Sequence, residues 1–208
     1  MPQDLLEGVT WLRHASFRIE SPGCVIYIDP WKLKAKAAPA DLILITHEHH
    51  DHFSPKDLDK IRRPDTSIVS VAAVTSKLSG DVHTVKAGDR LTVKGIDIEV
   101  VPAYNVDKHF HPLSKGGVGY ILTVGGRRIY HAGDTDAIPE MADIHADVAL
   151  VPVSGTYTMN ASEAAQAVNQ MQPAVAVPMH WGDAIGKRDD ALLFREKCKV
   201  PVQVMEAQ

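Results

Sequence analysis

An aliphatic run leads directly into a cluster of polar residues in the segment Leu42-Ile43-Leu44-Ile45-Thr46-His47-Glu48-His49-His50-Asp51-His52. The four aliphatic residues leave no polar face, which predicts a strand buried on both sides. After Thr46, four histidines and an aspartate fill five of the six positions from 47 to 52. Ser54-Pro55 then has the form of a helix cap followed by proline in the first turn. The polar cluster is therefore expected on a loop between a strand end and a helix, where open α/β sheets place ligand sites.

The spacing of this cluster favours metal binding. His47 and His49 are two apart and point to the same side of an extended segment, so they can bind one ion together. Asp51 and His52 are displaced around the turn and would reach a second position nearby. Imidazole and carboxylate groups are ligands for Zn²⁺ and are also accepted by Mn²⁺ or Fe. A solvated histidine-rich loop is the alternative, and the buried strand directly before the cluster argues against it.

The remaining periodicity predicts a chain of short strands with few helices. An antiparallel meander is expected first, then the buried strand and a helix over 55–60. Residues 32–40 could form a short helix or a loop. Asn105–Gly117 has no periodicity and is expected to be a functional or mobile loop. The further strands are predicted over 67–71, 82–85, 91–93, 96–101, 118–124, 127–130, 148–152 and 175–177, with helices over 160–171 and 189–197 and a terminal strand.

The bulk composition is that of a soluble globular protein. The 208 residues are 45% hydrophobic and 23% charged and allow one large domain, which we expect to span residues 1–208. A net charge of −4 argues against a nucleic-acid partner. Cys24 and Cys198 fit no metal motif and are expected to be free thiols. With neither a signal peptide nor an apolar run long enough for a membrane span, the expected location is the cytoplasm.

Three motifs together resemble the metallo-β-lactamase superfamily. His47 to His52 match its HxHxDH motif, Gly133-Asp134-Thr135-Asp136 looks like its GDTD segment, and Pro178-Met179-His180-Trp181-Gly182 looks like its late strand-end histidine. Further segments narrow the resemblance to small metal-dependent hydrolases similar to ascorbate-6-phosphate lactonase; they are 11–16, 28–31 and 155–159.

The resemblance implies a fold and a ligand set. The fold is an α/β (α+β) four-layer αβ/βα sandwich, in which two mixed β-sheets pack together with helices outside. Two divalent ions are implied, most simply Zn, with Mn, Fe or Ni as alternatives. His47 and His49 would bind the first ion, Asp51, His52 and His180 the second, and Asp134 would bridge them.

One departure leaves the first site open. The family pattern has a further histidine where this chain reads Ala103-Tyr104-Asn105. We expect His111 to complete the site, with His109 and Asn105 as alternatives. His14 resembles a family position that lines the cleft, or it is a core histidine. His131 is expected to pack in the core.

The implied activity is that of a hydrolase. A metal-bound hydroxide would cleave an ester-type bond, a lactone or a phosphodiester, of a small molecule. Asp51 and Asp134 would act with the ions, and His14 or His111 would move a proton. A phosphate on the substrate could be bound by cations near the cleft: Lys108, Lys115, Lys187 and Arg188. The alternatives are a nuclease-like phosphodiesterase and a catalytically weakened metal-binding or regulatory module. Proteins that resemble this one often form homo-oligomers, so both a monomer and a homo-oligomer are open for this chain.

Overall fold

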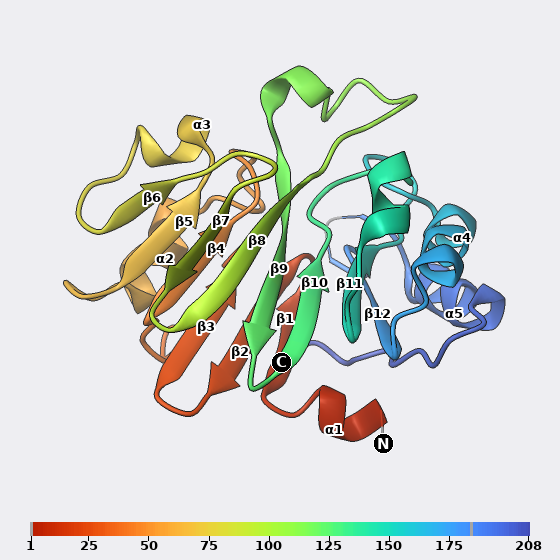
Figure 1. The fold of residues 1–208 in the computed structure, drawn as a ribbon, viewed down its shortest axis with the longest axis horizontal. Coiled ribbons are helices and arrows are strands. Elements are labelled where there is room, and N and C mark those ends of the chain that lie inside the picture. Colours follow the sequence, from red (N-terminus) through yellow and green to blue (C-terminus); the bar gives the residue numbers. More distant parts are fainter. Residues whose placement is uncertain (1, 184) are drawn as a thin grey trace.

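The chain folds into two six-stranded sheets that pack face to face. The computed structural model describes residues 2–183 and 185–208. The first sheet has the order β1-β2-β3-β4-β5-β6 and the second the order β12-β11-β10-β9-β8-β7. Figure 1 shows α2 and α3 on one side of the molecule and α4 and α5 on the other. This is the four-layer sandwich that the resemblance implies.

Both sheets are mixed, because each joins an antiparallel part to a parallel part. In the first sheet β1, β2 and β3 form the expected antiparallel meander, and β3 to β6 run parallel. Its strands are β1 (Val9–Arg13), β2 (Ser16–Ser21), β3 (Cys24–Ile28), β4 (Leu42–Ile45), β5 (Ser67–Ser70) and β6 (Val82–Thr84).

In the second sheet β7 to β10 are antiparallel, and β10, β11 and β12 are parallel. The strands are β7 (Arg90–Val93), β8 (Ile96–Pro102), β9 (Val118–Val124), β10 (Arg127–His131), β11 (Val148–Pro152) and β12 (Val175–Met179).

The helices are short, and capping side chains mark the starts of two of them. Ser54 caps α2 (Pro55–Ile61), and Asn160 with Glu163 forms a capping box on α4 (Ala161–Met171). The others are α1 (Pro2–Leu5), α3 (Ala72–Thr75), α5 (Arg188–Lys197) and the 3₁₀ turns η1 (Leu113–Lys115) and η2 (Pro139–Asp143). The sequence pattern did not indicate α1, α3, η1 or η2, because single turns are too short to show periodicity.

Two segments decide open or mistaken points of the predicted secondary structure. Residues 32–40 form a loop and not a helix. The predicted terminal strand was wrong, since only one isolated bridge joins Ala176 to Val202. Pro201 has no N–H group to donate and limits the pairing there. Cys24 and Cys198 are both free. Among residues 2–183 and 185–208, no helix has the length and apolar character needed to cross a membrane.

The hydrophobic core lies between and around the two sheets. All four residues of β4 are buried, which explains the unbroken aliphatic run of the sequence. Tyr120 of β9 donates its hydroxyl to the carbonyl of Ile45 in β4 (2.8 Å), so the second sheet is also hydrogen-bonded to the first at this strand end. The segment that follows Ile45 is thereby fixed from both sides.

Candidate metal centre

The candidate site lies where strands of both sheets end. The loop after β4 supplies His47, His49, Asp51 and His52. Strands β1, β10 and β12 are followed by His14, Asp134 and His180, and the loop after β8 supplies His111. Segments that are far apart in the sequence therefore meet at one edge, as expected for ligand sites of α/β sheets.

The first group of side chains consists of three histidines. His49 Nδ1 lies 3.0 Å from His47 Nε2 and 3.1 Å from His111 Nε2. The facing atoms of the three rings all lie within 4.8 Å of one another, which suits a single bound ion. His109 is exposed, so His111 is the histidine that the 105–117 loop brings to this point.

Asn105 supports His111 and does not face the group itself. Its Oδ1 accepts a hydrogen bond from the backbone N–H of His111 (2.9 Å) and lies 3.1 Å from His111 Nδ1. The Nδ1 atom is also 3.2 Å from the carbonyl of Tyr157. Two acceptors at Nδ1 require the proton there, so Nε2 keeps its lone pair toward His49.

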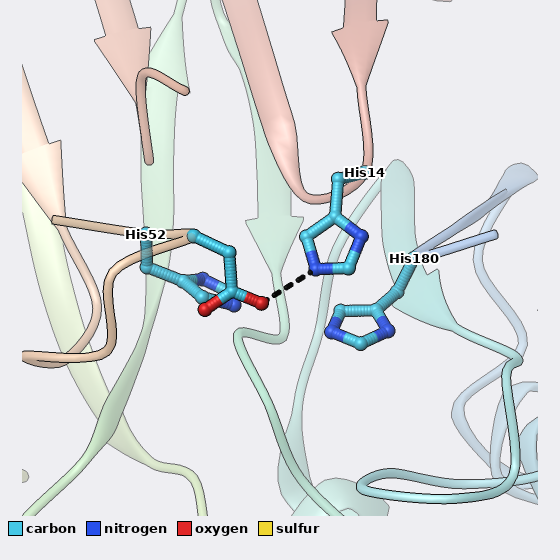
Figure 2. Close-up of side chains that lie close together, drawn as sticks. His14, His52 and His180 are labelled. Carbon is cyan, nitrogen blue, oxygen red and sulfur yellow. Dashed lines mark hydrogen bonds and ion pairs between the residues drawn. The ribbon is translucent and has the colours of Figure 1, made fainter. Parts of the chain in front are cut away.

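The second group contains Asp51, His52, His180 and His14, whose facing atoms also lie within 4.8 Å of one another. His14 Nε2 is 3.1 Å from Asp51 Oδ2. Figure 2 shows the His14 ring lying against that of His180, and their centroids are 3.8 Å apart. His14 is fully buried, and its ring lies within this group.

Asp134 lies between the two groups. Its Oδ1 is 3.4 Å from His52 Nε2, and its Oδ2 is 3.2 Å from His180 Nε2 and 3.4 Å from His111 Nε2. Gly133 positions it with a left-handed φ of 64°, and a Cβ there would approach the carbonyl of Val118 to 2.7 Å. Only glycine fits this close turn at the end of β10.

Two supporting residues hold the ring orientations, and the motifs did not identify them. Asp29 Oδ2 is 2.7 Å from His52 Nδ1 and accepts the hydroxyl of Thr46, while Oδ1 accepts the N–H of Thr46. Ser154 Oγ lies 2.9 Å from His180 Nδ1. Such contacts fix the ring and its tautomer in metal sites. Asp29 lies in the segment 28–31 that carried the resemblance, whereas Ser154 only precedes the segment 155–159.

The backbone is strained at three of these positions. His14, Asp29 and His180 have φ values of 49°, 47° and 62°, in the left-handed region that residues other than glycine seldom adopt. Each directly follows a strand. Such conformations cost on the order of 1–3 kcal/mol and cluster at functional sites. The surrounding contacts therefore hold these side chains in place against a local preference.

The electrostatics of the cluster favour cation binding. Burial lowers the pKa of His47 well below its ordinary value and also lowers that of His111, so both rings are held neutral, as metal binding requires. Burial by itself raises the pKa of Asp134, but His180 and His52 outweigh it and hold the pKa well below its usual range. For Asp51, burial is likewise outweighed by the hydrogen bond with His14 and by His52, so its pKa is also low.

His52 has the opposite shift. Burial lowers its pKa, but the carboxylates of Asp134 and Asp29 outweigh burial and raise the pKa well above the ordinary value. Two carboxylates at this point thus favour a positive charge between them.

Unpartnered polar atoms test whether these residues fit metal ions. Among the described residues, His52 Nε2, His180 Nε2 and Asp134 Oδ1 are buried without a hydrogen-bond partner. Such groups are costly unless something binds them. They converge on the centre of the cluster, and their nitrogen and oxygen donors suit Zn²⁺, Mn²⁺ or Fe²⁺. The residues therefore fit the metal ions that the resemblance implies.

The other candidate residues lie outside the cluster. His50 is exposed, and His131 is buried with its Nε2 2.8 Å from the carbonyl of Ala15, in the packing role expected for it. Lys108 pairs with Asp136 and Arg188 with Glu206, while the N–H of Lys187 caps α5 through Asp190. Of the four cations considered for phosphate binding, Lys115 lines the cavity beside the first histidine group.

A sandwich of two mixed sheets with a histidine and aspartate cluster at the strand ends defines a metallohydrolase class. A family model described as the β-lactamase superfamily domain matches residues 8–180. A UPF0173 metal-dependent hydrolase of Methanopyrus kandleri is 33% identical over 84% of each chain. One from Thermococcus kodakarensis is 35% identical, over 83% of this chain and 84% of the relative.

Solved structures agree with these matches. A protein from Parabacteroides distasonis, assigned as a metal-dependent hydrolase, has a TM-score of 0.87 and 35% identity over 96% of this chain and 93% of its own. Igni18, a metallo hydrolase of Ignicoccus hospitalis, has a TM-score of 0.77 and 27% identity over 95% of this chain and 94% of its own. The chain belongs to the metallo-β-lactamase superfamily, among its metal-dependent hydrolases.

Proposed function

We propose that the protein uses two divalent ions, most simply Zn²⁺, to hydrolyse an ester-type bond of a small molecule. The bond is a lactone, as in the lactonase-like branch that the sequence resembles, or a phosphodiester. The observation that carries this proposal is the position of Asp134, with one carboxylate between two groups of ligand-type side chains.

Each group would hold one ion. His47, His49 and His111 would hold the first, Asp51, His52 and His180 the second, and Asp134 would contact both. When bound, such ions act as Lewis acids and make water nucleophilic near neutral pH. Mn, Fe or Ni could replace Zn with the same donors.

Asp51 and His14 would act as a pair that orients the attacking water. Because Asp51 has a low pKa and is ionised, its carboxylate can only accept, and His14 therefore donates from Nε2. Burial lowers the pKa of His14, so its ring is neutral and holds the Asp51 carboxylate in place through this hydrogen bond. The carboxylate of Asp51 would in turn align the attacking water.

The alternative of a catalytically weakened module rested on Asn105. Its contacts with His111 give Asn105 a supporting role, and His111 supplies the imidazole that Asn105 lacks. An intact donor set favours the enzyme over the weakened module.

The first prediction concerns Asp134→Ala. We expect loss of metal and at least a hundredfold loss of chelator-sensitive turnover of dihydrocoumarin or bis(4-nitrophenyl) phosphate, on the order of the effect of removing one electrostatic stabiliser. Metal per chain is measured by plasma mass spectrometry. Asp143→Ala, at an exposed carboxylate of η2, is the matched control. An Asp134→Ala protein with full metal content and full turnover would contradict the dinuclear mechanism.

A further inference from the structure

Exposed apolar side chains gather beside the candidate metal centre. Among the described residues, four of the five exposed large hydrophobic side chains belong to this region, and the fifth, Leu193, lies on α5. The four form what we call the apolar lip: Val106, Phe110, Leu113 and Tyr157, with exposures of 57%, 49%, 62% and 37%. Figure 1 shows that the segment between β8 and β9, which carries three of them, projects beyond both sheets.

The lip is held in place from within the site. Phe110 packs edge-on against Tyr157 with ring centroids 4.5 Å apart. The N–H of Asn105 donates to the carbonyl of His111 (2.7 Å), and the N–H of Val106 donates to Asp136 Oδ2 (2.9 Å). The loop that exposes the lip is thus tied to the GDTD segment and to a candidate ligand. Its apolar side chains remain exposed although the backbone beneath them is fixed.

A cavity of about 70 Å³ joins the lip to the first histidine group. It is large enough for one small organic group beside the candidate reaction centre. Its lining includes the three histidines of the first group, Phe110 of the lip, and the charged residues Glu48 and Lys115.

Lys115 gives the cavity a cationic group. Within residues 2–183 and 185–208 the Lys115 ammonium forms no ion pair, not even with Glu48, which lines the same cavity. An anionic group on a ligand would therefore find an unpaired cation a short way from the apolar surface. Lys108, on the same loop, is already neutralised by Asp136.

We infer that the apolar lip and Lys115 select the substrate: an ester whose non-reacting part combines a ring or branched alkyl group with one anionic group. This inference rests on the proposed function. The apolar group lies against Phe110 and the anionic group reaches Lys115, while the ester lies at the histidines. Burial of the lip then adds binding energy from a part of the substrate that does not react.

The test measures binding without turnover, on the zinc-loaded full chain by isothermal titration calorimetry. The probes are 3-phenylpropionate, which has both features, 3-phenylpropan-1-ol, which lacks the charge, and acetate, which lacks the ring. The acid should bind about tenfold more tightly than acetate, as burial of part of a ring contributes. Phenethyl phosphate serves as a second acid and distinguishes a phosphate from a carboxylate.

The variants separate the two features. Phe110→Ala should weaken both phenyl probes about tenfold and leave acetate unchanged. Lys115→Met should weaken the acids and leave the alcohol unchanged, and Lys115→Arg should restore the acids. Leu193→Ala and Lys56→Met, at an exposed apolar and an exposed cationic position away from the cavity, should change nothing.

Three results would overturn the inference. One is equal binding of acetate and the phenyl acid, and another is equal effects of Phe110→Ala and Leu193→Ala. The third is a change of oligomeric state in Phe110→Ala with unchanged probe affinity, which would make the lip a contact between copies. A protein that binds the acid as described but hydrolyses no ester retains this inference and contradicts the proposed function.

Discussion

The role of three histidines in this site depends on the contact that the second ring nitrogen, Nδ1, makes. His52, His111 and His180 each direct Nε2 toward the centre because Nδ1 contacts Asp29, Asn105 and Ser154 respectively. The acceptors at Nδ1 of His52 and His111 fix their tautomers, and the tautomer decides which nitrogen keeps a lone pair for a metal. The Ser154 hydroxyl, which can donate or accept, orients the ring of His180. Asn105 therefore acts through His111, although it occupies the position where the family pattern has a ligand.

Asn105→Ala tests this role. Without the Oδ1 acceptor His111 can rotate, and we expect the affinity for one of two metal equivalents to fall about 10- to 100-fold. The second equivalent, held by Asp51, His52 and His180, should be retained. A titration against a competing chelator measures both, and Asn105→Asp, which keeps the acceptor, should restore much of the loss. Equal loss of both ions would contradict the division into two groups.

Among the secondary-structure elements, α2 is linked to the loop after β3 by the carboxylate of Asp57. Asp57 accepts the backbone N–H groups of Lys32 and Leu33 (2.8 and 2.9 Å) and contacts Ser54 and Lys60. These contacts join the start of the 32–40 loop to α2, and Lys32 itself has a left-handed φ of 49°, which is not helical geometry. Burial raises the pKa of Asp57, but these hydrogen bonds outweigh it and lower the pKa.

The Asp57 contacts predict a pH-dependent stability. Because the folded-state pKa is lowered, the stabilisation is present above the unfolded-state value of about 3.9 and is lost as pH falls through the folded-state pKa. Asp57→Ala should cost about 1–3 kcal/mol in the free energy of unfolding at pH 7, since two backbone donors lose their acceptor. The difference from the parent should shrink below pH 4.

Urea unfolding at pH 7 and at pH 3 measures this effect. Asp59→Ala, at an exposed position of the same helix, is the control and should stay close to the parent at both values. An Asp57→Ala difference that is the same at both pH values would contradict the assignment to its ionised form.

Over the whole molecule, the candidate centre joins the two sheets. The first sheet leads into His14, His47, His49, Asp51 and His52, while the second leads into His111, Asp134 and His180. A metal ion would therefore bind the folded chain much more tightly than an unfolded chain, in which the segments that carry these residues are far apart. Binding to the folded state alone raises its stability by mass action.

We therefore expect added Zn²⁺ to raise the thermal midpoint and EDTA to lower it. At a free metal concentration about 1,000 times Kd the gain is about 4 kcal/mol. Differential scanning calorimetry measures the shift, and Asp134→Ala should abolish most of it while Asp143→Ala keeps it. A thermal midpoint that changes with neither added metal nor chelator would show that the cluster does not bind ions in the folded chain.

Local patterns in the sequence predict the longer helices, most of the strands and the types of ligand. The aliphatic run before His47, the cap at Asn160 and the spacing of His47, His49, Asp51 and His52 are local patterns, and local patterns can be read from neighbouring residues. The resemblance placed Asp134 and His180 in the same site. The prediction of a terminal strand was wrong, because the residue pattern near Pro201 is strand-like whereas the chain forms only one bridge there.

Only the tertiary structure decided which side chains complete and surround the cluster. The sequence left His111, His109 and Asn105 open, because their directions depend on contacts with Tyr157 and His49, far away in the chain. Asp29 and Ser154 gain their roles from rings that other strands supply, and the apolar lip meets the cavity only when β8 and β9 are paired. Contacts between distant segments form by packing the two sheets together, and no local pattern encodes them.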